Sequence, residues 1–122
     1  MDAEELLKRY AAGERDFTGA NLAFAKLIGA NLAGLGLWGA NLNGANLAKA
    51  KLWGANLCGA NLAKANLTRA NLSGANLVKA NLRQAKLRYT KLYGANLSEA
   101  CYDDSTQFPR GFDPIARNMS KV

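Results

Sequence analysis

The residues in this chain that have reactive side chains are mainly lysines and arginines. Histidine is absent, and the only cysteines, Cys58 and Cys101, lie far apart in the sequence. This composition excludes histidine-assisted nucleophiles, histidine-bound zinc and a disulfide framework, and neither cysteine has a basic neighbour that would activate its thiol. We therefore predict no catalytic residue, no metal site and no cofactor, and we expect the protein not to be an enzyme.

The positive charge is concentrated in the middle of the chain. The net charge is +7, yet residues 17 to 98 contain ten basic residues and no acidic one, and the acidic residues lie toward the two ends. A surface of one sign attracts polyanions such as nucleic acid or the acidic face of another protein. The alternative interpretation is a solvated surface that keeps the folded chain soluble.

An internal repeat of five residues must position these charges. From Phe17 to Tyr102 every fifth residue is large and apolar, and sixteen consecutive repeats from Leu22 to Leu97 have leucine at this central position. The residue two places earlier is nearly always alanine, and the residue just before the centre is most often asparagine. A period of five builds no apolar face on an α-helix and alternates faces on a flat strand. The chain must therefore turn once per repeat, with leucine and alanine inside.

Units such as Ala20-Asn21-Leu22 and Ala55-Asn56-Leu57 resemble the A(D/N)LXX signature of the pentapeptide-repeat family. The match covers residues 15 to 104, and the chain ends resemble those of short single-domain cyanobacterial members. The resemblance implies an all-β fold, a right-handed quadrilateral β-helix with four pentapeptides per coil and about 4.5 coils in this chain. On this interpretation the structural core contains Leu37, Leu57, Leu77 and Leu97, which are four repeats apart and stack on one another.

The segments that flank the repeats are expected to cover the two ends of the solenoid. Residues 1–14 predict a capping helix, with Asp2 at its start and Gly13 at its end. Residues 15–104 form the β-helix. Residues 105–122 are predicted to be a C-terminal cap or tail, whose apolar residues cover the last coil: Phe108, Phe112, Ile115 and Met119.

One repeat departs from the pattern, because Leu35 occupies a slot that alanine fills almost everywhere else. We predict a local outward shift of the backbone here, which the absence of a side chain at Gly36 permits. The asparagine columns, for example Asn21 and Asn41, predict side-chain amides bonded to one another or to the backbone of the turns.

Folding the repeat at four pentapeptides per coil collects half of the central basic residues on one face. This candidate basic face contains Lys26, Lys49, Arg69, Lys86 and Arg88. Lys51 and Lys91 are assigned to the next face along the coil. The sequence shows no regular alternation of aromatic and basic residues of the kind that single-strand binders use, and Tyr89 beside Arg88 is the one close pair.

Exposed aromatic side chains are predicted on the face after the basic one. Trp53 and Tyr93 follow central leucines on this face, and glycine is the next residue after each. They form a candidate protein-contact patch, although isolated surface aromatics are also ordinary in soluble proteins.

The function that these observations favour is a non-enzymatic scaffold or protein–protein interaction module. The alternative is electrostatic binding of nucleic acid or another polyanion through the basic face. The family resemblance also points to the inhibition of DNA gyrase by acidic towers that mimic DNA. The positive charge disfavours that activity, because Asp16 is the sole aspartate just before a repeat centre.

The start of the chain is acidic, and no apolar run approaches the length that spans a membrane. We therefore expect a cytoplasmic protein with no membrane association. A monomer or weak dimer is expected, with a protein as the first candidate partner and nucleic acid as the second.

Overall fold

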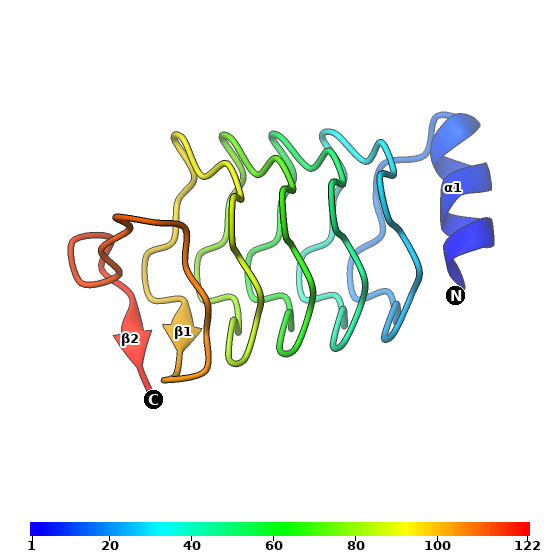
Figure 1. The fold of residues 1–122 in the computed structure, drawn as a ribbon. Helices are drawn as coiled ribbons and strands as arrows, with labels where there is room; N and C mark the ends of the chain where they lie inside the picture. The colour runs from blue at the N-terminus through cyan, green and yellow to red at the C-terminus, as the bar shows by residue number, and fades with distance from the viewer.

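The computed structural model describes residues 1–122, and most of them form a stack of coils (Figure 1). The helix α1, Ala3–Ala11, lies at one end of the stack. Two short strands, β1 (Cys101–Tyr102) and β2 (Ser120–Lys121), pair in parallel at the other end. No helix in the structure is both long and apolar enough to cross a membrane.

Parallel backbone pairing connects each coil to the next. Isolated bridges run from Asp16 with Gly36 to Lys86 with Gln107, and all but the last join residues 20 apart. Between Leu42 and Asn61, for example, the amide of Leu42 donates to the carbonyl of Asn61 at 2.7 Å. A coil therefore contains four pentapeptides. Repeats that stack directly on one another form a wall, and we name each wall after one central leucine: the Leu47, Leu52, Leu57 and Leu62 walls.

The interior contains the central residues and the alanines that precede them. Leu37, Leu57, Leu77 and Leu97 are all buried, as are most of the alanines two places before a centre. Alanine suits this position because the side chains of adjacent walls converge inside a narrow coil. Thr90 replaces it once, and its hydroxyl donates to the carbonyl of Leu67 at 2.7 Å, which satisfies the buried polar group.

The predicted outward shift at Leu35 is wrong. Leu35 is fully buried, and the ladder passes through this repeat without a break, since the amide of Asn56 donates to the carbonyl of Leu35 at 2.9 Å. The residue one coil earlier in the same column is Arg15, whose guanidinium lies outside over the ring of Tyr10. We attribute the fit of Leu35 to the interior space that Arg15 leaves. Gly36 instead permits the backbone pairing with Asp16, because a Cβ at position 36 would lie only 3.0 Å from the carbonyl oxygen of Arg15.

Asparagine closes the turn of its own repeat. At all eleven repeats with asparagine before the centre, its Oδ1 accepts a hydrogen bond from the backbone amide two residues later, at 3.0 to 3.4 Å. An amide-to-amide bond between coils occurs once, from Asn41 Nδ2 to Asn21 Oδ1 at 3.4 Å. The turn residue that follows has a positive φ and is glycine in nine repeats, as the left-handed region favours.

The helix α1 packs against the first coil. Asp2 caps it, with Oδ1 accepting from the amide of Glu5 at 2.9 Å, and Leu6 is completely buried in the same core as the central leucines. The hydroxyl of Tyr10 donates to the carbonyl of Ala33 at 2.8 Å. This bond satisfies one of the carbonyls that the first coil would otherwise leave without a partner.

Residues after Asp104 add a partial coil to the ladder. Gln107 pairs with Lys86, and β2 pairs with β1. Phe108 stacks on Phe112 with ring centroids 4.8 Å apart, and the guanidinium of Arg117 donates to the carbonyl of Leu92 at 3.2 Å. Met119 is buried, but the prediction that Ile115 covers the last coil is wrong, since Ile115 is 78% exposed. Ile115 lies in the turn that Asp113 caps, and its side chain is directed into solvent.

Candidate binding surface

A shallow groove lies at the corner between the Leu47 and Leu52 walls. We call it the corner groove, and its volume is about 390 Å³. Four of its lining residues are basic and one is aromatic: the lining consists of Lys49, Ala50, Lys51, Trp53, Arg69, Asn71 and Lys91. The lining of the groove therefore combines one indole ring with four cationic side chains.

The ladder determines where these cations lie. Lys49 and Arg69 occupy the same turn position in adjacent coils, with φ of 61° at both. Lys51 pairs with Asn71, and Asn71 pairs with Lys91, so the two lysines stand two coils apart in one column. At ~4.8 Å per coil this separation is about 10 Å.

No acidic residue neutralises the groove. The ion pairs in the structure join Arg9 to Glu14 and Lys121 to Asp104, which lie near the two ends of the stack. Acidic residues near the repeats have other partners. The hydroxyl and amide of Thr18 donate to Asp16 and hold the pKa of that carboxyl below its usual value. The Leu47 and Leu52 walls contain no aspartate or glutamate.

Two lysines of the groove depart from the commonest repeat sequence. Lys51 and Lys91 stand where asparagine closes the turn, and a lysine side chain has no acceptor for that hydrogen bond. Lys49 and Arg69 have the positive φ of their turn position, as do non-glycine residues in six other repeats, for example Lys64 and Lys79. The departure from the repeat pattern at the groove is therefore the loss of the turn-closing hydrogen bond at Lys51 and Lys91.

Aromatic rings lie among the cations. Trp53 is 52% exposed at the groove, and Tyr93 is 87% exposed two coils further along the same column. The guanidinium of Arg69 lies 4.7 Å from the ring centroid of Tyr89, its neighbour one coil later. Sequence reading found only Tyr89 beside Arg88, because it compared neighbours along the chain. A comparison of residues one coil apart would have revealed the pair of Arg69 and Tyr89.

The structure divides the predicted basic face. Lys49 and Arg69 line the corner groove, whereas Arg88 lines a second hollow of about 290 Å³ at the C-terminal end with Tyr89, Phe108 and Arg110. Lys86 lies three coils from Lys26 in the same column, and asparagine occupies this position in the two coils between them. The groove also includes Lys51 and Lys91, which sequence analysis assigned to the next face. The predicted aromatic patch contributes Trp53 to the groove lining, while Tyr93 lies outside that lining.

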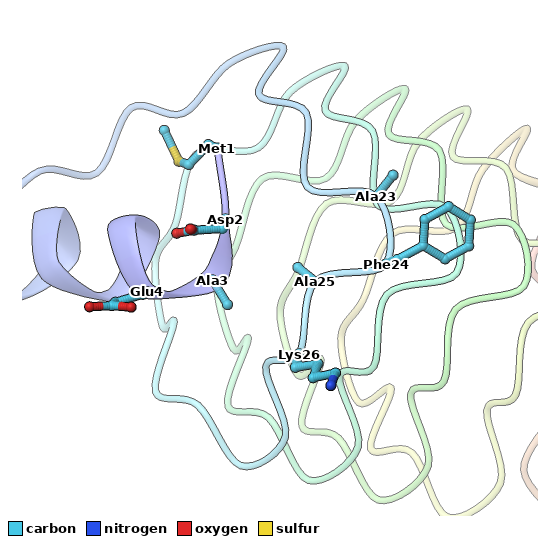
Figure 2. A pocket seen from close by; sticks show the side chains of 8 residues that line it. All are labelled: Met1, Asp2, Ala3, Glu4, Ala23, Phe24, Ala25 and Lys26. Atoms are coloured by element: carbon cyan, nitrogen blue, oxygen red, sulfur yellow. The ribbon is translucent and has the colours of Figure 1, made fainter.

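Lys26 lies apart from the other members of the predicted face. It lines a cleft between the first coil and the start of α1, together with Ala25, Phe24 and Asp2 (Figure 2). The ring of Phe24 runs along the next coil, where a Cβ on Gly44 would meet it at 2.5 Å. Asp2 and Glu4, at the start of α1, line the same cleft, so Lys26 shares its surroundings with acidic residues, unlike the cations of the corner groove.

The coils stack around a closed apolar interior and present charged and aromatic side chains on their outer walls. This arrangement defines a solenoid repeat protein. The chain belongs to the pentapeptide repeat family: the model for pentapeptide repeats matches eight copies, over residues 16–35, 40–77 and 65–101. The fold is therefore a β-helix, as the sequence resemblance implied.

Solved structures of cyanobacterial proteins are similar to this chain. The protein alr5209 from Nostoc Pcc 7120, a pentapeptide repeat protein, is 36% identical, with a TM-score of 0.86 over 99% of this chain and 96% of that one. Rfr23 from Cyanothece 51142 is 43% identical, with a TM-score of 0.76 over 76% of this chain and 63% of that one. No protein with a curated description matches the chain.

Proposed function

We propose that this protein is a non-enzymatic scaffold that presents its walls to an anionic macromolecule. The scaffold is a right-handed quadrilateral β-helix, closed at one end by α1 and at the other by residues 105–122. The observation that supports the binding role is the corner groove, where four cations gather without a neutralising acid. Solubility alone would be served by charges at any exposed position, without the loss of turn hydrogen bonds at Lys51 and Lys91.

Two classes of partner carry the required negative charge. The first is a protein with an acidic surface, which the family membership makes a natural candidate because solenoid walls provide extended binding surfaces. The second is nucleic acid, and the aromatic ring within the cationic groove is the specific observation that favours it.

Retention on immobilised heparin tests whether position matters beyond net charge. The groove variant replaces Lys49, Arg69 and Lys91 by glutamine, and the matched control replaces Lys64, Lys79 and Arg83, which lie on the other two walls. Both variants lose the same charge. We expect the groove variant to elute at clearly lower salt than the control. Elution of both variants at the same salt concentration would contradict the proposal, because only net charge would then matter.

A further inference from the structure

We propose that the corner groove binds single-stranded nucleic acid, with a base stacked on Trp53 and neighbouring phosphates held by Lys49, Lys51, Arg69 and Lys91. This inference rests on the proposed function and names its partner class. A nucleotide has a group for each feature of the groove. Its planar base can stack on the indole of Trp53, and its phosphate can pair with the cations. An acidic peptide would use the cations and leave Trp53 without a role.

The aromatic contact selects single strands over duplexes. In a duplex the faces of the bases are stacked on one another, so an indole on a protein surface has no access to them. Trp53 is half exposed at the edge of the groove, where an unpaired base can reach its ring. The ring of Tyr89 orients the guanidinium of Arg69 by the cation–π contact at 4.7 Å.

The size of the groove suits a short run of nucleotides. Lys51 and Lys91 are two ladder steps apart, about 10 Å at ~4.8 Å per step. This length accommodates a short run of nucleotides. Beyond the groove, the C-terminal hollow also combines basic and aromatic side chains. Arg88, Tyr89, Phe108 and Arg110 line it. A longer strand therefore has a surface to follow.

The molecule contains an internal control for the stacking step. Trp38 occupies the same repeat position as Trp53 and is equally exposed, at 55% against 52%, but it lies on the Leu57 wall. The chain has two tryptophans. Trp38→Phe therefore leaves Trp53 as the single indole reporter, and Trp53→Phe leaves Trp38.

The experiment titrates these two variants with dodecamers of deoxythymidylate and uridylate at low salt and follows tryptophan emission. We expect the oligonucleotides to quench the emission of Trp53 and to leave that of Trp38 unchanged. In parallel, the fluorescence anisotropy of labelled oligonucleotides measures affinity. Trp53→Ala should weaken binding about tenfold, and Trp38→Ala should leave it unchanged.

The salt dependence tests the phosphate contacts. Replacing Lys51 and Lys91 by glutamine should lower the affinity and flatten the log–log salt slope by about 1.4, at roughly 0.7 for each lost contact with a single strand. The matched replacement of Lys64 and Lys79 should leave the slope unchanged. Circular dichroism checks that all variants keep the wild-type spectrum.

Three results would overturn the inference. One is the absence of oligonucleotide binding at low salt; the second is equal binding of a duplex of the same length; the third is equal affinity of Trp53→Ala and wild type. If any of these occurs while the groove variant still elutes early from heparin, the scaffold proposal stands and the partner is another polyanion, such as an acidic protein. If heparin retention also depends only on net charge, both proposals fail.

Discussion

The interior and the corner groove occupy opposite sides of the same repeats, yet the interior residues follow the repeat pattern more closely than the groove residues do. Inside, nearly every repeat supplies the residue that packs best, leucine at the centre and alanine before it. At the groove, Lys51 and Lys91 replace the asparagine that closes the turn in eleven other repeats.

This difference distinguishes two roles within one short repeat. The interior residues stabilise the stack, because a coil that loses a leucine loses contacts with the coils on both sides. On the proposed function, Lys51 and Lys91 serve binding at the expense of a turn-closing hydrogen bond. Lysine as such occurs on all four walls, for example at Lys64 and Lys79. All four lysines that replace the turn-closing asparagine lie instead on the Leu47 and Leu52 walls: Lys26, Lys51, Lys86 and Lys91.

The largest effect is expected from a change inside the solenoid. Leu57→Ala creates a cavity in the middle of the stack and should lower the free energy of unfolding by about 2–5 kcal/mol. Ser73→Ala, on the outer surface of the Leu52 wall, should change it by less than about 0.5 kcal/mol. Urea denaturation followed by circular dichroism measures both. Similar losses at the two positions would remove the distinction between interior and exterior.

The second prediction extends the interior to α1. Leu6 is fully buried against the coils, so Leu6→Asp places a charge in the core and should destabilise the protein by about 3 kcal/mol or more. An uncovered first coil also exposes unpaired backbone groups, which favour association of towers end to end. Size-exclusion chromatography with light scattering measures this association. A variant that remains monomeric with an unchanged melting temperature would contradict the capping role of α1.

The third prediction tests the cost of the groove directly. Lys51→Asn restores the side chain that closes the turn in eleven other repeats, and it should raise the free energy of unfolding by about 0.5–1.5 kcal/mol. Lys51→Gln removes the same charge without placing an acceptor at the right distance, so it serves as the matched control. The Asn variant should be more stable than the Gln variant and should bind polyanions as weakly. Equal stability of the two variants would show that the lysine carries no penalty.

The smallest effect concerns an acidic turn outside the groove. Burial opposes ionisation of Asp103, but hydrogen bonds from the amides of Gln84 and Ser105 and from Thr106 outweigh it, so the pKa of Asp103 lies below its usual value. A carboxyl that is more acidic in the folded state stabilises the fold above its unfolded pKa of ~3.9. That stability is lost as the pH falls through the folded value.

Acid titration of wild type and Asp103→Asn measures this contribution. The amide keeps an acceptor but does not ionise, so the stability difference between the two proteins should shrink steadily between pH 5 and 2. We expect this change to be smaller than that of Lys51→Asn, because desolvation of the Asp103 carboxyl offsets part of what its hydrogen bonds contribute. A constant difference over the whole range would mean that ionisation of Asp103 does not contribute.

The solenoid was predictable because its signal is repeated and local. A leucine every fifth residue from Leu22 to Leu97 excludes both regular elements, and the family signature supplies the coil of four repeats. The prediction for Leu35 fails because the preference for alanine holds in the middle of the stack, where the neighbouring coils on both sides supply inward side chains. At the first coil the neighbour in its column is Arg15, whose side chain lies outside.

The corner groove was only partly predictable. Sequence folding placed Lys49 and Arg69 on one face but assigned Lys51, Lys91 and Trp53 to the next, because it treated each wall as a separate surface. Lys49 and Arg69 stand at the turn where one wall passes into the next, and residues of both walls line the groove there. The same limitation applies to Ile115, whose exposure depends on the turn that Asp113 caps.

The hydrogen bond from each asparagine to the amide two residues later closes within a single pentapeptide. The turn of a repeat therefore does not depend on how many repeats the chain has. The encoding gene can lengthen or shorten in units of fifteen bases, which encode one pentapeptide. A duplication of four pentapeptides adds one coil and keeps every column intact. A duplication of one pentapeptide between Trp53 and Arg69 would move all later repeats round by one wall. Lys91 would then leave the column of Lys51. A whole coil inserted at the same place would keep that column but would separate Lys49 from Arg69 by two coils instead of one, so an intact groove restricts length changes to the repeats outside it.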